Sequence, residues 1–216
     1  MLRIGTRHRL SSRQEVNHCI GSKTALSMLP ACFINPGDLT LMTVPGYPVA
    51  GTHTRYFGGS VFQLPLTPEN NFLPDLESIP ADIVKKAKLL VINYPNSPTG
   101  QLATEDFYGQ VVEFARRNEI VVIQDAAHVL LTFDGPPRSF LQTPGAREVG
   151  VDVHSLSKGY DMIGWRIGCV CGNATIVQAF ADVKDNSDSG QFIAIQKSAA
   201  AALDNDSIHQ RVRQKY

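Results

Sequence analysis

The sequence lacks any excess of charge. Its 216 residues contain 20 basic and 20 acidic side chains, so the formal net charge is zero. Proteins that bind nucleic acid or an anionic membrane by electrostatic attraction are typically basic. The sequence also lacks an apolar run that approaches the ~20 residues of a membrane-spanning helix. We therefore predict neither a nucleic-acid partner nor a membrane partner.

Cysteine is scarce, and its four positions do not have the spacing of a zinc site. Cys169 and Cys171 form a C-x-C pair, while Cys19 and Cys32 lie far from them in the sequence. So few cysteines in a chain of this length are typical of free thiols in a reducing compartment, and we predict a cytoplasmic location. Because Cys169 and Cys171 alternate within a strand-like run, we expect both to pack on one face.

Acidic residues are absent from the first fourteen positions, which contain four arginines. That composition is similar to a transit peptide, but the segment is short and has no clear amphipathic stripe. We favour an irregular N-terminal remnant over residues 1–15.

The rest of the sequence alternates between strand-like and helix-like segments, which indicates an α/β fold. The runs 87–94 and 119–125 are almost entirely apolar, as in parallel strands that are covered on both faces. In the helix predicted at 104–118, Thr104 is a plausible N-cap, and acidic and basic residues occupy its first and last turns. Further strands are predicted at 39–44, 60–66, 149–155 and 166–172, and further helices at 22–34, 49–59, 173–185, 190–204 and from 206 onward.

Polar side chains follow three of the predicted strands. Asn96 comes after the strand 87–94, Asp125 ends the strand 119–125, and Ser155, Ser157 and Lys158 follow the run "VGVDVH". Ligands of open parallel α/β sheets bind at the carboxyl ends of the strands. A carboxylate at the end of an apolar strand is poorly solvated unless a cation faces it. The alternative for Asp125 is an ordinary capping role in the following loop.

Two features of the sequence indicate an anion-binding site. Gly21–Thr24 opens a helix whose free N–H groups form a natural phosphate cup, although the segment is not a Walker loop. Arg166 could bind an anion together with Ser155 and Ser157. A strand-end carboxylate, a lysine amine and an anion site together match pyridoxal 5'-phosphate, which has a phosphate, a basic ring nitrogen and a carbonyl that reacts with an amine.

Four motifs carry a resemblance to a known family. They are "PGYP" at 45–48, "NSPTG" at 96–100, "DAAH" at 125–128 and "SLSKGYDMIGWRIG" at 155–168. In this order and approximate spacing they resemble the fold-type I, class I/II aminotransferases, over nearly the whole chain from Val16 onward. The stretches "EVNHCIGSK" and "DVKDNSDSGQF" are most similar to the LL-diaminopimelate aminotransferase group. The resemblance implies a three-layer α/β/α architecture with a mostly parallel mixed sheet.

The resemblance implies a role for each matching residue. Lys158 would hold the cofactor through its amine and later carry the substrate's proton, Asp125 would pair with the ring nitrogen, and Tyr47 would stack on the ring. The phosphate would be bound by the backbone N–H groups of Ser22 and Lys23 and by Ser155, Ser157 and Arg166.

Two positions depart from the family pattern. The family usually has an asparagine directly before Pro-Thr-Gly, which binds the phenolic oxygen of the cofactor; Ser97 stands there, and Asn96 is one residue earlier. A family tyrosine that shares this oxygen is replaced by His128, which can donate the same hydrogen bond but titrates nearer neutrality.

The resemblance also predicts the organisation of the chain. Residues 16–205 would form the cofactor-binding large domain, and 206–216 would begin a helix that leads to a missing small domain. The expected reaction is transamination of an amino acid with a 2-oxo acid, for example LL-diaminopimelate with 2-oxoglutarate, in a homodimer. Because family members are considerably longer and bind the substrate carboxylate with a C-terminal arginine, we expect this chain to transaminate poorly. The polar segment 184–192, including Asp188, would approach the partner subunit.

Other interpretations remain open. Ser155 and Lys158 also form a Ser-x-x-Lys motif, as in penicillin-binding proteins, but the companion motifs are lacking and Ser155 is expected to end a strand rather than open a helix. The chain could instead be a non-catalytic scaffold or dimerisation remnant, or could serve another fold-type I reaction such as β-elimination or decarboxylation. We interpret Trp165 as a core residue, and His18, His53, His154 and His209 as structural or solvent-facing.

Overall fold

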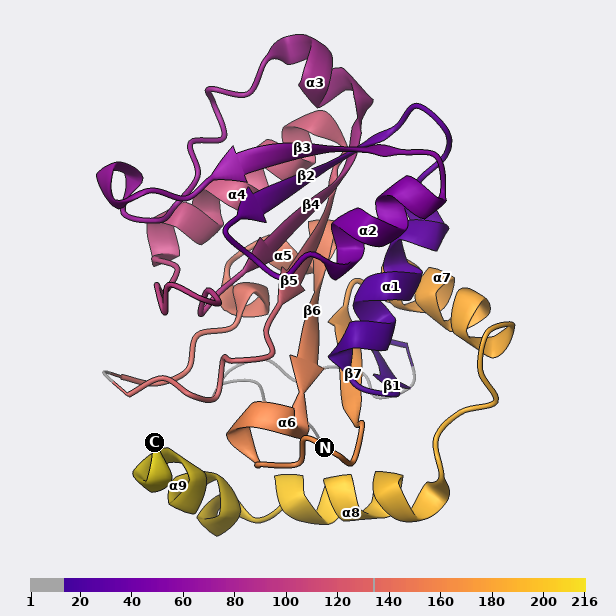
Figure 1. Ribbon diagram of the computed structural model, residues 1–216, viewed down its shortest axis with the longest axis vertical. Coiled ribbons are helices and arrows are strands. Elements are labelled where there is room, and N and C mark those ends of the chain that lie inside the picture. The colour runs from indigo at the N-terminus through magenta and orange to yellow at the C-terminus, as the bar shows by residue number, and fades with distance from the viewer. Residues whose placement is uncertain (1–13, 134) are drawn as a thin grey trace.

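The computed structural model describes residues 14–133 and 135–216. Within them a seven-stranded sheet runs in the order β1-β7-β6-β5-β4-β2-β3 (Figure 1). The pairs among β2, β3, β4, β5 and β6 are parallel, and β7 pairs antiparallel with both β6 and β1. The predicted mixed, mostly parallel sheet is confirmed. The strands are β1 (Val16–Cys19), β2 (Leu39–Val44), β3 (Ser60–Pro65), β4 (Ala87–Asn93), β5 (Val121–Asp125), β6 (Gly150–Ser155) and β7 (Gly168–Gly172).

Helices cover both faces of this sheet and one end of it. Figure 1 shows α1 (Ser22–Phe33), α2 (Val49–Tyr56) and α7 (Ala174–Asp185) on one face, and α4 (Glu105–Asn118) on the other. The shorter α3 (Ala81–Lys86) and α5 (Ala146–Val149) pack on the α4 side. Beyond the carboxyl ends of β5 and β6 lie α6 (Leu156–Gly159), α8 (Ile193–Leu203) and α9 (Asp206–Lys215), which share a small apolar cluster. The predicted three-layer α/β/α architecture is confirmed.

The alternation of side chains in β4 explains why its sequence is apolar throughout. Leu90 and Ile92 belong to the apolar cluster beneath α4, whereas Leu89 and Val91 belong to the cluster beneath α1, α2 and α7. Successive residues of a strand point to opposite faces, so a strand between two helical layers must be apolar at every position.

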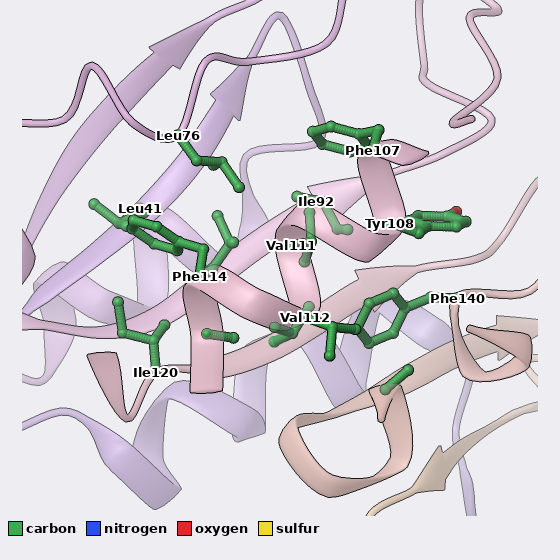
Figure 2. Packing of buried hydrophobic residues seen from close by; sticks show 14 of the residues in the cluster. Leu41, Leu76, Ile92, Phe107, Tyr108, Val111, Val112, Phe114, Ile120 and Phe140 are labelled. Atoms are coloured by element: carbon green, nitrogen blue, oxygen red, sulfur yellow. The ribbon is translucent and has the colours of Figure 1, made fainter. Parts of the chain in front are cut away.

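The helix α4 supplies the largest side chains of one cluster. Phe107, Val111 and Phe114 project from it toward the sheet (Figure 2). Its N-terminus is closed as predicted, because the Thr104 hydroxyl accepts a hydrogen bond of 3.1 Å from the Phe107 N–H. Its C-terminus ends at Glu119, which has a left-handed backbone with φ of 54°.

Two predicted strand starts and the predicted burial of one side chain need correction. The strand predicted at 166–172 begins at Gly168, so Arg166 precedes it, and the strand predicted from Val149 begins at Gly150. The prediction that Trp165 fills the core is wrong, because this residue is 46% exposed. Ile163, in the same turn, is also exposed.

The short elements β1, α3 and α6 were not predicted. Each has between four and six residues, too few for a hydrophobic period to be recognisable. None of the helices in the described ranges is long and apolar enough to cross a bilayer.

Candidate functional site

Register brings the predicted strand-end residues to one edge of the sheet. β4, β5 and β6 are neighbours, with Asn93 paired to Asp125 and Asp125 paired to Val153. Two residues beyond Val153 in β6, Ser155 pairs with Gly168, and Gly168 pairs with Cys19. The segments that follow β5, β6 and β1 therefore leave the sheet at the same end, and this is the end where parallel α/β sheets bind ligands.

Asp125 is a buried carboxylate with little compensation from hydrogen bonds. It is 4% exposed, and its Oδ1 accepts one hydrogen bond of 3.2 Å, from the Ala127 N–H. Burial raises the pKa of Asp125 to about 6, although this backbone hydrogen bond and the charge of His154 act in the opposite direction. The loop-capping role that we considered as the alternative is thus present, but it leaves the second oxygen available for a ligand.

His154 was interpreted as structural, and the structure gives it a second role beside Asp125. Its Nε2 lies 3.4 Å from Oδ2 of the buried Asp152, which also accepts a 2.5 Å hydrogen bond from the Ser139 hydroxyl. Burial lowers the pKa of His154, but the hydrogen bond and charge of Asp152 outweigh it, so the pKa is raised overall. When protonated, His154 places a positive charge near Asp125. The signal in the sequence was a histidine at the end of an apolar strand.

Lys158 lies on α6, directly after β6. The turn is fixed by Ser155, whose hydroxyl accepts a 3.1 Å hydrogen bond from the Ser157 N–H. α6 packs tightly on the segment that follows β5: a methyl group at Gly159 would lie 2.6 Å from Cβ of Leu130. Lys158 is half-buried, and its charge is close enough to His128 to lower the pKa of that histidine.

His128 presents an unsatisfied nitrogen. Its Nδ1 is buried and has no hydrogen-bond partner among the described residues. Burial and the charge of Lys158 lower the pKa of His128, so the ring is neutral at physiological pH. His128, Ser97 and Asn96 line the same cavity of about 370 Å³, together with Leu131 and Phe133. The two residues that depart from the family pattern therefore share one cavity, which their separation in the sequence did not reveal.

The anion site is formed by the first turn of α1 and the turn before β7. Gly21 has a φ of 75°, and a methyl group at this position would overlap the guanidinium of Arg166. The N–H groups of Ser22 and Lys23 belong to the first turn of α1, where backbone donors have no acceptor within the helix. A guanidinium next to a helix N-terminus is well suited to a phosphate. Gly168 links this group to β6, because it pairs with Ser155 and a methyl group there would lie 3.2 Å from the Ser22 nitrogen at the start of α1.

Tyr47 lies near Lys23 of the first turn of α1, whereas the side chain of Asn96 bonds to neighbouring loop residues. The Lys23 Nζ is 5.8 Å from the centre of the Tyr47 ring, which is 37% exposed. Asn96 is buried, and its Nδ2 donates to the Pro45 carbonyl at 3.2 Å while its Oδ1 accepts from the Thr99 hydroxyl and N–H. With these bonds Asn96 fixes the loop that precedes Tyr47, and its side chain has little capacity left for a ligand.

These residues fit the chemistry of pyridoxal 5'-phosphate. A first helical turn and a guanidinium provide donors for the phosphate, and a buried carboxylate with a pKa near neutrality suits a protonated ring nitrogen. The unsatisfied Nδ1 of His128 and the amine of Lys158 follow the neighbouring strands β5 and β6. The described residues contain no cluster of three or more metal-ligating side chains, and all four cysteines are free thiols.

The Ser-x-x-Lys alternative can also be judged from the structure. Ser155 ends β6 as expected, but it also caps α6, so the expectation that it opens no helix was wrong. Its hydroxyl accepts a hydrogen bond from the Ser157 N–H, and no bond joins it to Lys158 within the described part of the chain. A serine nucleophile needs its base within hydrogen-bond reach, so this geometry disfavours the alternative.

The sequence comparisons agree with this chemistry. The family described as aminotransferase class I and II matches residues 3–215. The LL-diaminopimelate aminotransferase of Methanocaldococcus jannaschii is 59% identical over 202 residues, which cover 94% of this chain and 48% of that protein. The enzyme of the same name from Methanococcus maripaludis is 55% identical over 202 residues and is covered to 49%. The chain thus spans about half the length of the curated relatives it matches.

Solved structures give the same result. Substrate-bound BacF from Bacillus subtilis is 36% identical, with a TM-score of 0.92, over 95% of this chain and 52% of that one. A probable N-succinyldiaminopimelate aminotransferase from Thermus thermophilus is 30% identical, with a TM-score of 0.89, over 95% of this chain and 56% of that one.

Proposed function

Because the chain belongs to the aminotransferase class I and II family, we propose that it binds pyridoxal 5'-phosphate and serves the transfer of an amino group from an amino acid to a 2-oxo acid. The observation that supports this most is that three groups lie at one edge of the sheet. They are Asp125 at the end of β5, Lys158 on α6, and Arg166, which precedes β7 and lies against the start of α1. We assign the cofactor-binding domain to residues 16–205, with 206–216 beginning a separate element.

In this proposal each residue has a chemical task. The carboxylate of Asp125, which is mostly ionised above pH 6, holds a proton on the ring nitrogen, and protonation of His154 favours the ionised form of Asp125. When bound, the cofactor supplies an electron-accepting ring. Lys158 anchors the cofactor through its amine, and after its release it moves the proton at the substrate Cα.

The remaining residues bind and orient the cofactor. Ser22, Lys23 and Arg166 hold the phosphate, with Ser155 and Ser157 supporting the turn beside it. Tyr47 covers one side of the ring from the loop after β2. We assign His128 and Ser97, rather than Asn96, to the phenolic oxygen, because His128 has a free buried nitrogen while the Asn96 amide is already bonded.

We further propose LL-diaminopimelate as the amino donor and 2-oxoglutarate as the acceptor. Support comes from the names of relatives at 59% and 55% identity. We keep a homodimer and a cytoplasmic location as predictions; the four free cysteines support the latter. Asp188 is unsuitable for testing the dimer, because its side chain binds Lys184 within the same chain.

The proposal is tested by adding pyridoxal 5'-phosphate to the purified chain and recording its absorbance spectrum. We expect a new band in the violet that is lost in Lys158→Ala and retained in Lys197→Ala, which removes an exposed lysine of α8. A wild-type chain that never develops the band would support the non-catalytic scaffold. A band that persists in Lys158→Ala would remove Lys158 from its role. The substrate is tested by whether LL-diaminopimelate discharges the band faster than L-alanine does.

A further inference from the structure

Arg166 has an unusual backbone for an arginine. Its φ is 52°, in the left-handed region, which costs a residue with a side chain about 1 kcal/mol or more. The guanidinium turns back on its own loop, where Nη1 donates to the Ile163 carbonyl at 3.0 Å, and it lies against Gly21 at the start of α1. A conformation of this kind persists only when neighbouring groups hold it in place.

Gln191, from a distant part of the sequence, stabilises this backbone conformation through hydrogen bonds. It is 9% exposed, and its side-chain Nε2 donates to the Trp165 carbonyl at 2.9 Å and to the Arg166 carbonyl. Both acceptors are backbone carbonyls, so only the amide nitrogen can make these bonds and the orientation of the amide is settled. One side chain therefore donates hydrogen bonds to two consecutive backbone carbonyls in the turn before β7.

Gln191 is itself held by a compact segment that follows α7. Lys184, 2% exposed, makes a 2.5 Å ion pair with Asp188, whose Oδ1 also accepts a 2.8 Å hydrogen bond from the Gly190 N–H. The Gln191 carbonyl in turn accepts a 2.7 Å hydrogen bond from Gln196 Nε2 of α8. The amide that reaches Arg166 is thus fixed on both sides along the chain.

We propose that Gln191 is a positioning residue for anion binding: by bonding the Trp165 and Arg166 carbonyls it aims the Arg166 guanidinium at the N-terminus of α1. This inference rests on the proposed function only for the identity of the anion, a phosphate carried on the cofactor. Its direct consequence is that Gln191 affects affinity for the phosphate group and leaves affinity for the remainder of the cofactor unchanged.

The test compares pyridoxal 5'-phosphate with pyridoxal, which lacks the phosphate. Wild type, Gln191→Met and Gln191→Glu are titrated with each, and Kd is read from absorbance. We expect both variants to bind pyridoxal 5'-phosphate about tenfold more weakly, the order expected when one charge-assisted hydrogen bond is misplaced, with the Kd of pyridoxal unchanged. Gln178→Met, which removes an amide that bonds Asp182 on the exposed face of α7, serves as the matched control and should match wild type with both ligands.

A double substitution separates positioning from general loosening of the fold. In an Arg166→Ala background, Gln191→Met should add no further loss of phosphate affinity, because the group it positions is gone. Equal losses for both ligands, or losses that add in the double variant, would overturn the inference. If Gln191→Met does not fold by circular dichroism, Gln191→Leu replaces it, because a carboxylate in Gln191→Glu would also repel the phosphate by its charge. A wild-type chain that binds neither ligand contradicts the proposed function, whereas binding that is unaffected at position 191 contradicts only this inference.

Discussion

The apolar cluster beneath α4 and the edge formed by the ends of β4, β5 and β6 differ in the kind of side chain that they bury. Beneath α4, Phe107, Val111 and Phe114 are almost fully buried against the sheet, and the helix is closed by the Thr104 cap (Figure 2). At the strand ends, Asp125 is a buried carboxylate and His128 has a buried nitrogen without a described partner.

Backbone conformation makes the same distinction. Gly21 and Arg166, which lie against each other at the anion site, both have left-handed φ values. The helix α4 has a regular backbone until it ends at Glu119, which is also left-handed. The region beneath α4 therefore buries apolar side chains under a regular helix, whereas the site at the strand ends combines a buried carboxylate with a left-handed arginine. Substitutions in the two regions should consequently have opposite effects on the stability of the ligand-free chain.

The largest effect is expected in the core. Phe107→Ala should lower the free energy of unfolding by about 3–5 kcal/mol, because it removes a buried ring that also makes an edge contact with Tyr94 at 5.4 Å. The measurement is urea unfolding followed by circular dichroism. Phe192→Ala makes the same change at a side chain that is 74% exposed, and it should stay within about 0.5 kcal/mol of wild type. Similar losses in both variants would mean that this cluster does not dominate stability.

The opposite sign is expected for Asp125→Asn. In the folded chain the pKa of Asp125 is raised from 3.8 to about 6, so the folded state binds a proton more tightly than the unfolded state does. Stability due to this group is therefore present below pH 4 and is lost as the pH rises to 6 and beyond. Asparagine keeps the shape and the bond from the Ala127 N–H but carries no charge. We expect the variant to be about 2–3 kcal/mol more stable than wild type at pH 8, and equally stable at pH 4.

This prediction is checked by urea unfolding of both proteins at pH 4 and pH 8, without cofactor. The same variant should bind pyridoxal 5'-phosphate more weakly, since the ring nitrogen loses its carboxylate. Gains in stability together with losses in binding are the expected signature of a site that is strained for function. A variant that is less stable at pH 8 would indicate that the carboxylate is already compensated in the ligand-free chain.

The comparison also explains which features could be predicted from the sequence. The strands β4 and β5 and the helix α4 were predictable because burial on defined faces imposes a period on their residues. The convergence of Asp125, Lys158 and Arg166 was predicted through strand ends and motif order. Those signals are local, or they are shared with a family.

The features that escaped prediction depend on contacts between distant segments. Gln191 reaches Trp165 and Arg166 across about twenty-five residues of sequence, and no local pattern encodes that distance. His154 is an exception: Asp152, the partner that raises its pKa, lies two residues earlier in β6, so both side chains point to the same face and the spacing did offer this signal. Trp165 was wrongly placed in the core because its size was weighed and the exposed turn around it was not.

The smallest effect, and the most direct test of the strand-end region, is expected for His128→Phe. The substitution removes the unsatisfied Nδ1 while keeping a ring of similar size, so the ligand-free chain should gain about 1 kcal/mol at pH 7. Burial and the charge of Lys158 lower the pKa of His128, so the folded state binds fewer protons than the unfolded state and wild type loses stability as the pH falls through 6.5. The advantage of the phenylalanine variant should therefore grow below pH 6.5, in urea unfolding at pH 5.5 and 7.5.

Binding should change in the other direction. If His128 donates to the cofactor, His128→Phe should raise the Kd for pyridoxal 5'-phosphate about tenfold, whereas His128→Gln, which keeps a donor, should recover part of that loss. His53→Phe changes a histidine of α2 that packs on Tyr56, away from the strand ends, and should leave the Kd unchanged. Unchanged affinity in His128→Phe would mean that the free nitrogen faces no ligand. The contrast between the two regions would then rest on Asp125 and Arg166, because the cavity that His128 shares with Ser97 would have no part in binding the cofactor.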